Sequence, residues 1–135
     1  MKHFSLRLLH ATGSETIDNV TSFVGEDASG SFGILAGHAR MMTTLVTGLA
    51  RFQDDGKSWR YLALPGALLY FHDNLLTLGT RRYLLDEDYS RISQALQEQL
   101  LAEERQLRAM KESLHRMEEE IIKRLWAIGR GGMEI

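Results

Sequence analysis

Apolar and polar residues alternate with a period of two through the first 86 residues. At the start, the apolar residues Phe4, Leu6 and Leu8 are separated by polar ones, which is the pattern of a strand that is buried on one face. We expect further strands at 20–24, 31–35, 45–52, 59–63, 67–71, 75–79 and 83–85. Turn residues such as Asp55-Gly56 separate these segments and no helical pattern interrupts them, so the sequence predicts an antiparallel β-sandwich.

A helical period replaces this pattern from Asp88 onward. Neither Gly nor Pro occurs between Asp88 and Ile128, and apolar residues recur at spacings of three, four and seven. These residues are Ile92, Leu96, Leu100, Leu107, Met110, Leu114, Met117, Ile121, Leu125 and Ile128. The pattern predicts either a helical hairpin with its turn at 102–106, where the stripe is weakest, or one extended helix, with Gly129 as the C-terminal cap. These apolar residues form a stripe along the helix. The stripe serves either to pack against the core of this chain alone or also to contact a partner.

The distribution of glycine divides the chain at the same place. Nine of the 12 glycines lie within residues 1–79 and none lies between 80 and 128, while the segment 87–135 is denser in charge. We therefore expect an α+β protein with a sandwich domain at 1–86 and a helical domain at 87–135. The two i,i+4 pairs Glu104–Arg108 and Glu120–Arg124 have the favoured acidic-first order on the helix, as do 112–116 and 119–123.

Composition excludes several kinds of chemistry. The net charge is −2, from 16 Lys+Arg and 18 Asp+Glu, so no basic excess indicates a nucleic-acid partner. The absence of cysteine excludes a disulfide scaffold, a thiolate nucleophile and a cysteine-ligated metal site. The five histidines have no metal-ligand spacing and no nucleophile elbow occurs, so we expect no catalytic residue, no metal site and no cofactor.

Neither a signal peptide nor a membrane-spanning run is expected. Arg7 and His10 interrupt the apolar residues at the N-terminus, and no window approaches the roughly 20 apolar residues that a spanning helix needs. We therefore expect a soluble, cytosolic chain that meets a membrane only through another protein. A free-standing sandwich adaptor that dimerises through its helices and a small enzyme that depends on His38 are the alternatives.

Residues 25–48 contain five glycines around a short apolar strand, which favours an exposed contact surface. The segment contains Glu26-Asp27, Phe32-Gly33-Ile34-Leu35, Gly37-His38-Ala39 and Thr44-Leu45, and it ends in Gly48. It resembles the epsilon subunit of F-type ATP synthases. The passage 62–69, the strand 75–78 and the order of sandwich and helices are similar to that family over nearly the whole chain.

This resemblance implies a non-catalytic subunit of the central stalk. In the family, the sandwich holds the gamma subunit and rests on the c-subunit ring, and it couples ion-driven rotation of the ring to gamma rotation and ATP synthesis. The family's helices lie folded on the sandwich or extend toward the catalytic alpha/beta hexamer, where they inhibit ATP hydrolysis. The implied location is the cytoplasmic face of the bacterial inner membrane, as a peripheral part of the complex.

The resemblance also implies roles for particular residues. The loops that face the c ring would carry Glu26, Asp27, Ser31, His38, Arg40 and Met42. The helices could contact acidic surfaces of the catalytic subunits, or form a solvated face, through Arg105, Arg108, Lys111, Arg116, Lys123 and Arg124. In some members a motif at the start of the first helix binds ATP. Asp88 and Arg91 match this motif, but a role as charges at the start of a helix suffices to explain them, and we favour that role. Ser31 stands where many members have an acidic residue, and the tail 124–132 points to a divergent branch.

Overall fold

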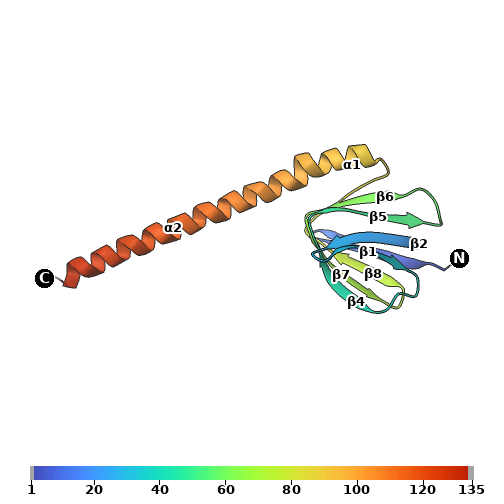
Figure 1. Ribbon diagram of the computed structural model, residues 1–135, viewed down its shortest axis with the longest axis horizontal. Helices are drawn as coiled ribbons and strands as arrows, with labels where there is room; N and C mark the ends of the chain where they lie inside the picture. The colour runs from blue at the N-terminus through green and yellow to red at the C-terminus, as the bar shows by residue number, and fades with distance from the viewer. Residues whose placement is uncertain (1, 134–135) are drawn as a thin grey trace. The chain divides into compact units, whose positions relative to one another are not determined.

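The structure is a computed structural model that describes residues 2–133 of the chain, and it divides into two compact units, Met1–Leu101 and Ala102–Ile135. Nine strands occur among the described residues, and all of them belong to the first unit (Figure 1). They are β1 (Phe4–His10), β2 (Gly13–Asp27), β3 (Gly30–Leu35), β4 (Met41–Leu45), β5 (Gly48–Asp54), β6 (Arg60–Leu64), β7 (Ala67–His72), β8 (Leu75–Gly79) and β9 (Leu84–Asp86).

The strands follow the order β1-β8-β7-β4-β2-β5-β6-β9, with β3 paired to β2. An additional pairing between β1 and β2 closes β1, β8, β7, β4 and β2 into a ring, and β5, β6 and β9 continue the sheet from β2. All pairings are antiparallel except that of β1 with β8, which is parallel. The predicted α+β class, with a β-sandwich followed by a long helix, is confirmed.

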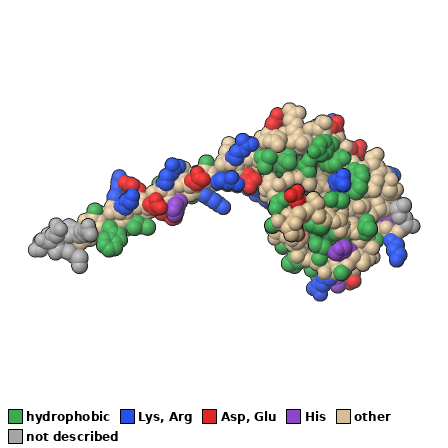
Figure 2. Space-filling model, viewed as in Figure 1, with side chains coloured by type: hydrophobic (Ala, Val, Ile, Leu, Met, Phe, Trp, Pro, Cys, Tyr) green, Lys and Arg blue, Asp and Glu red, His purple; other side chains and the backbone are tan. Residues whose placement is uncertain are grey.

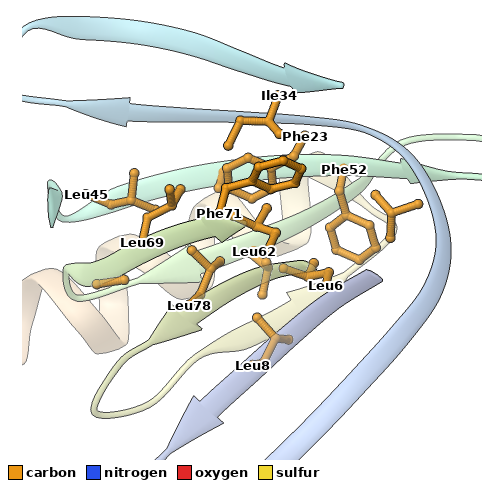
Figure 3. Packing of buried hydrophobic residues seen from close by; sticks show 14 of the residues in the cluster. Leu6, Leu8, Phe23, Ile34, Leu45, Phe52, Leu62, Leu69, Phe71 and Leu78 are labelled. Atoms are coloured by element: carbon orange, nitrogen blue, oxygen red, sulfur yellow. The ribbon is translucent and has the colours of Figure 1, made fainter. Parts of the chain in front are cut away.

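The core lies between the two layers of strands and is made of inward-facing aromatic and aliphatic side chains (Figure 3). Phe23, Phe52 and Phe71 are its largest fully buried members, and leucines from β1, β6, β7 and β8 fill the space around them. The ring of Phe71 meets the edge of Phe4 with centroids 5.7 Å apart. Alternate residues of each strand enter this core, as the period of two predicts.

Two tight turns show why the strands end where they do. Asp55 and Gly56 both have positive φ, 50° and 67°, between β5 and β6, and the predicted turn at this Asp-Gly pair is confirmed. Asp73 and Asn74 have φ of 49° and 59° between β7 and β8. The single strand expected at 45–52 was wrong, because the chain leaves β4 at Leu45 and begins β5 at Gly48 with different partner strands.

The first helical segments pack on the sandwich. Helix α1 (Tyr89–Ala95) continues into the π-helical turn η1 (Leu96–Leu100). Their buried residues Ile92, Leu96 and Leu100 cover Ala63 of β6, which is completely buried, and form a second, smaller apolar cluster. This packing explains why the first compact unit extends to Leu101.

Helix α2 (Leu101–Met133) supplies the second unit, which we call the arm and define as residues 102–133. The hairpin turn expected at 102–106 was wrong, because these residues are helical throughout. The segment contains no Gly or Pro to break the helix, so its polar side chains alone do not end it. The expected cap at Gly129 was also wrong, since the helix continues to Met133.

Candidate interaction surfaces

One outer face of the sandwich is built by β4, β7, β8 and β1. Register places Thr44 beside Leu68, Leu68 beside Gly79 and Gly79 beside Leu9, in one row across all four strands. Leu68 is 52% exposed and Leu9 is 39% exposed. A β-carbon added at Gly79 would have no neighbour within 4 Å among the described residues, and the φ of this glycine is not in the left-handed region. The row therefore has a depression between two exposed leucines.

The next row on this face combines apolar and basic groups. Met42 lies beside Tyr70, Tyr70 beside Thr77 and Thr77 beside Arg7. Met42 is 64% exposed. The Arg40 guanidinium lies over the Tyr70 ring, 5.6 Å from its centroid, and a terminal nitrogen of Arg7 donates to the Thr77 hydroxyl at 3.4 Å.

We call Leu9, Met42, Leu68, Tyr70 and Gly79 the open face. Its residues come from four strands and converge only in the folded sheet. An exposed apolar face of this kind, bordered by basic groups, is typical of a surface that binds another protein.

The residues predicted to face the c ring separate into two groups. Glu26, Asp27 and Ser31 lie at the turn between β2 and β3, where Glu26 pairs with Ser31. Asp27 accepts hydrogen bonds from the Ser29 amide at 2.9 Å and from the Thr43 hydroxyl at 2.9 Å. Hydrogen bonds from the side chains of Ser29 and Thr43 hold the pKa of Asp27 below its ordinary value, so this carboxylate stays ionised. We call Glu26, Asp27 and Ser31 the acidic turn.

His38 and Arg40 lie in the loop between β3 and β4, at the opposite end of β3. The Gly37 amide donates to the Asn74 side-chain oxygen at 2.7 Å, which ties this loop to the turn between β7 and β8. The His38 ring packs edge-on against Phe71, with centroids 5.8 Å apart. Arg40 thus borders the open face, and Met42 belongs to it. The acidic turn lies beside β4, because the Asp27 carboxylate accepts from Thr43, the residue after Met42, whereas His38 lies beyond the far end of β3.

A cleft of about 310 Å³ lies next to the acidic turn, between the outer face of β2 and β5 and helix α1. Glu26 and Ser31 line it together with Val24 and Leu49. Tyr61 and Tyr89 also line it, and their rings meet edge to face with centroids 5.4 Å apart. The acidic turn therefore borders a socket that has an aromatic wall and can receive a protruding side chain of a partner.

Asp88 and Arg91, the residues of the predicted nucleotide motif, are engaged at the start of α1. The Asp88 carboxylate accepts from the Arg91 amide at 3.0 Å and caps the helix. The Arg91 guanidinium donates to both carboxylate oxygens of Asp86, at 2.5 and 2.7 Å. This pairing holds the pKa of Asp86 below its ordinary value and raises the pKa of Arg91. The sequence places Asp86 among the acidic residues at the helix start, but its pairing with Arg91 was not predicted, although the spacing of five residues was the available signal.

The six predicted basic contacts of the arm are all exposed, and charged side chains of both signs cover its surface (Figure 2). Two of the four predicted i,i+4 pairs form among the described residues: Arg108 with Glu104 at 3.7 Å and Arg124 with Glu120 at 3.8 Å. Glu119 instead contacts His115 at 3.2 Å. Exposed pairs of this kind contribute little, so these side chains remain available to a partner.

The described residues contain neither a group of metal ligands nor a helix that could cross a membrane. Among residues 2–133, no three His, Cys, Asp or Glu side chains are grouped so that they could hold a metal ion. No helix in the same range is both long enough and apolar enough to span a bilayer.

Residues 3–84, which include nearly the whole sandwich, match the family model described as "ATP synthase, Delta/Epsilon chain, beta-sandwich domain". The chain belongs to the ATP synthase delta/epsilon chain family. The resemblance to the epsilon subunit is thereby confirmed, and three named relatives agree with it.

The chain is 32% identical over 83 residues to ATP synthase epsilon chain 2 of Cereibacter sphaeroides, which covers 61% of this chain and 57% of that one. It is 31% identical over 114 residues to the epsilon chain of Caldicellulosiruptor bescii, covering 84% and 79% of the two chains. The match to the epsilon chain of Prochloron didemni is 35% identical and covers 52% of each. The chain thus spans little more than half the length of two of these relatives.

Two solved structures share the fold of this family member. A chain of the Euglena gracilis mitochondrial ATP synthase superimposes with a TM-score of 0.56 and 19% identity, covering 69% of this chain and 61% of that one. A chain of the central stalk and c-ring structure of the Tetrahymena thermophila enzyme gives a TM-score of 0.50 and 11% identity, covering 62% and 66%. At these identities the likeness shows the fold.

Proposed function

We propose that this chain is a non-catalytic central-stalk subunit of an F-type ATP synthase, which rotates with the gamma subunit and couples ion-driven rotation of the c ring to ATP synthesis. The observation that carries the proposal is the family match over residues 3–84. The structural relatives include a chain from a central stalk and c-ring assembly, which agrees with such a place. The chain would then sit at the cytoplasmic face of a bacterial inner membrane, attached through its partner subunits.

The open face is the surface that we assign to the gamma subunit. Leu9, Met42 and Leu68 are exposed apolar side chains on one face of a sheet, and burying them against a partner would gain about 25 cal/mol for each Å² removed from water. Arg40, stacked on Tyr70, borders the same face. His38, Arg40 and Met42 are therefore assigned to this contact rather than to the c ring.

The acidic turn is the surface that we assign to the c ring. Its two carboxylates suit basic side chains in the loops of the ring, and the neighbouring cleft offers an aromatic wall to such side chains. The hydrogen bonds from Ser29 and Thr43 hold Asp27 in one orientation. Ser31 contributes a hydroxyl beside Glu26 in place of a further charge.

The arm is the part that we assign to inhibition of ATP hydrolysis, through contact with the catalytic hexamer. Truncation after Leu101 tests this role cleanly, because the buried residues Ile92, Leu96 and Leu100 stay with the sandwich. We expect faster ATP hydrolysis by the assembled enzyme together with unchanged binding of gamma. Unchanged hydrolysis would remove the inhibitory role. Asp88 and Arg91 are assigned to the start of α1 rather than to a nucleotide, since their polar groups already have partners.

Binding of the gamma subunit is the experiment that tests the proposed function. Gly79→Gln would place a side chain in the depression of the open face without backbone strain, and we expect it to weaken gamma binding at least tenfold. The matched control is Gly33→Gln, because Gly33 faces outward on the opposite layer and a β-carbon there would make only an ordinary contact of 3.7 Å with the Phe23 carbonyl. Equal binding by both variants would exclude the open face, and no binding by the unaltered chain would exclude the function.

A further inference from the structure

The arm carries an apolar seam that the described residues leave exposed. Leu107, Met110, Leu114, Met117 and Ile121 follow one another at spacings of three and four on α2, and their exposed fractions run from 42% to 63%. Such spacing assigns them to the a and d positions of a heptad, with Arg124 at the next d position. The seam is about 27 Å long from residue 107 to residue 124, at roughly 1.5 Å per residue. We use the name seam for these six residues.

The seam is self-complementary when a second copy runs in the opposite direction. In that arrangement an a position of one helix meets a d position of the other. Leu114 then meets Met117 of the second copy, Met110 meets Ile121, and Leu107 meets the aliphatic stem of Arg124. Each layer occurs twice by symmetry, so four of the six layers are wholly apolar.

The charges beside the seam specify this same register. This register places Lys111 of one copy beside Glu118 of the other, and the two-fold symmetry produces the same pair a second time. Neither residue forms an ion pair within the described chain, and their neighbours at i±4 are Leu107 and His115 for Lys111, and Leu114 and Ile122 for Glu118. Two oppositely charged residues without local partners thus meet across the seam.

Other arrangements bring like charges together. A parallel pair in register places Arg124 against Arg124 of the second copy in a core layer. An antiparallel shift by one heptad in one direction opposes Glu118 to Glu118 and Glu120 to Glu120, and the shift in the other direction opposes Lys111 to Lys111. Like charges at flanking positions are how coiled coils exclude wrong registers.

We propose that the free chain forms an antiparallel homodimer through the seam, with Leu114 opposite Met117 of the second copy. The dimer covers the apolar face of the arm before the chain enters its complex, and it competes with whatever the arm contacts there. The proposal goes beyond the proposed function, and the two fail separately, because the open face lies on the sandwich and the seam on the arm.

Charge reversal across the seam is the first test, and sedimentation equilibrium of the full chain is its measurement. Lys111→Glu and Glu118→Lys each turn two attractive contacts into repulsive ones, and we expect each to raise the dimer dissociation constant roughly tenfold. The double variant restores the charge pairing, so its constant returns toward that of the unaltered chain. Glu112→Lys is the matched control, since residue 112 lies on the far side of the helix. A monomer at all concentrations, or a double variant as weak as the single ones, would overturn the proposal.

Disulfide trapping is the second test, because the chain has no cysteine of its own. An oxidised mixture of Leu114→Cys and Met117→Cys chains is expected to give mainly mixed dimers, since these positions face each other only in the antiparallel register. A parallel dimer would instead cross-link each variant with itself. Predominant self-linking would therefore overturn the antiparallel arrangement, and gamma binding measured alongside shows whether the proposed function stands.

Discussion

Ile92 is the residue through which we expect helix α1 to be fixed to the sandwich. Its side chain is 1% exposed and packs with Leu96 and Leu100 over Ala63. Ile92→Ala removes three carbons from this contact, and at about 0.8 kcal/mol for each buried methylene the transfer loss is about 2.4 kcal/mol. The cavity left behind adds to this, so the docking of α1 should weaken by about 3 kcal/mol.

Hydrogen exchange measured by mass spectrometry on peptides from residues 89–100 detects this loss directly. A change of about 3 kcal/mol in local opening makes these amides exchange roughly 150-fold faster. Gln97→Ala is the matched control, because Gln97 lies in the same helical stretch but is exposed, and we expect its effect to stay within about 0.5 kcal/mol. Unchanged exchange in the Ile92 variant would refute the reasoning that burial against Ala63 holds the helix.

Three other predictions follow from single contacts. The pKa of Asp27 is lowered in the folded chain, so its contribution to stability is present above the ordinary value near 3.8 and is lost as the pH falls through the lower, folded value. The free energy of unfolding of Asp27→Asn, measured by urea titration, should therefore decrease less steeply than that of the unaltered chain as the pH falls through this range. Asp86→Asn frees the Arg91 guanidinium, and hydrogen exchange at the start of α1 should become faster. Gly25→Ala would bring a β-carbon within 2.9 Å of the Phe23 ring and should lower the free energy of unfolding by about 1–3 kcal/mol, measured by urea titration.

The sandwich could be predicted because the alternation of apolar and polar residues within a strand shows which of its faces is buried. Phe4, Leu6 and Leu8 alternate with polar residues, and all three are buried. The break between β4 and β5 was not predicted, since Leu45 and Val46 continue an apolar run while the chain changes its partner strands. Strand exchange of this kind depends on pairing with distant residues, which no local pattern records.

The open face could not be predicted for a related reason. Leu9 and Leu68 appear in the sequence as unrelated apolar residues at strand positions that face outward. Only the register of β1 with β8 and of β8 with β7 places them on either side of Gly79. For the arm, the periodicity predicted a helix but did not decide its form. No breaker residue marks a turn, so a hairpin and one extended helix were both compatible with the pattern.

Rotation is the measurement that tests the central claim most directly. Ser58 lies in the exposed turn between β5 and β6, and Ser58→Cys supplies the chain with its sole thiol for attaching a bead. The chain is bound to gamma in an immobilised catalytic hexamer. If it is a central-stalk subunit, we expect the bead to turn in steps when ATP is added. A bead that stays still while a probe on gamma rotates in the same preparation would contradict the account.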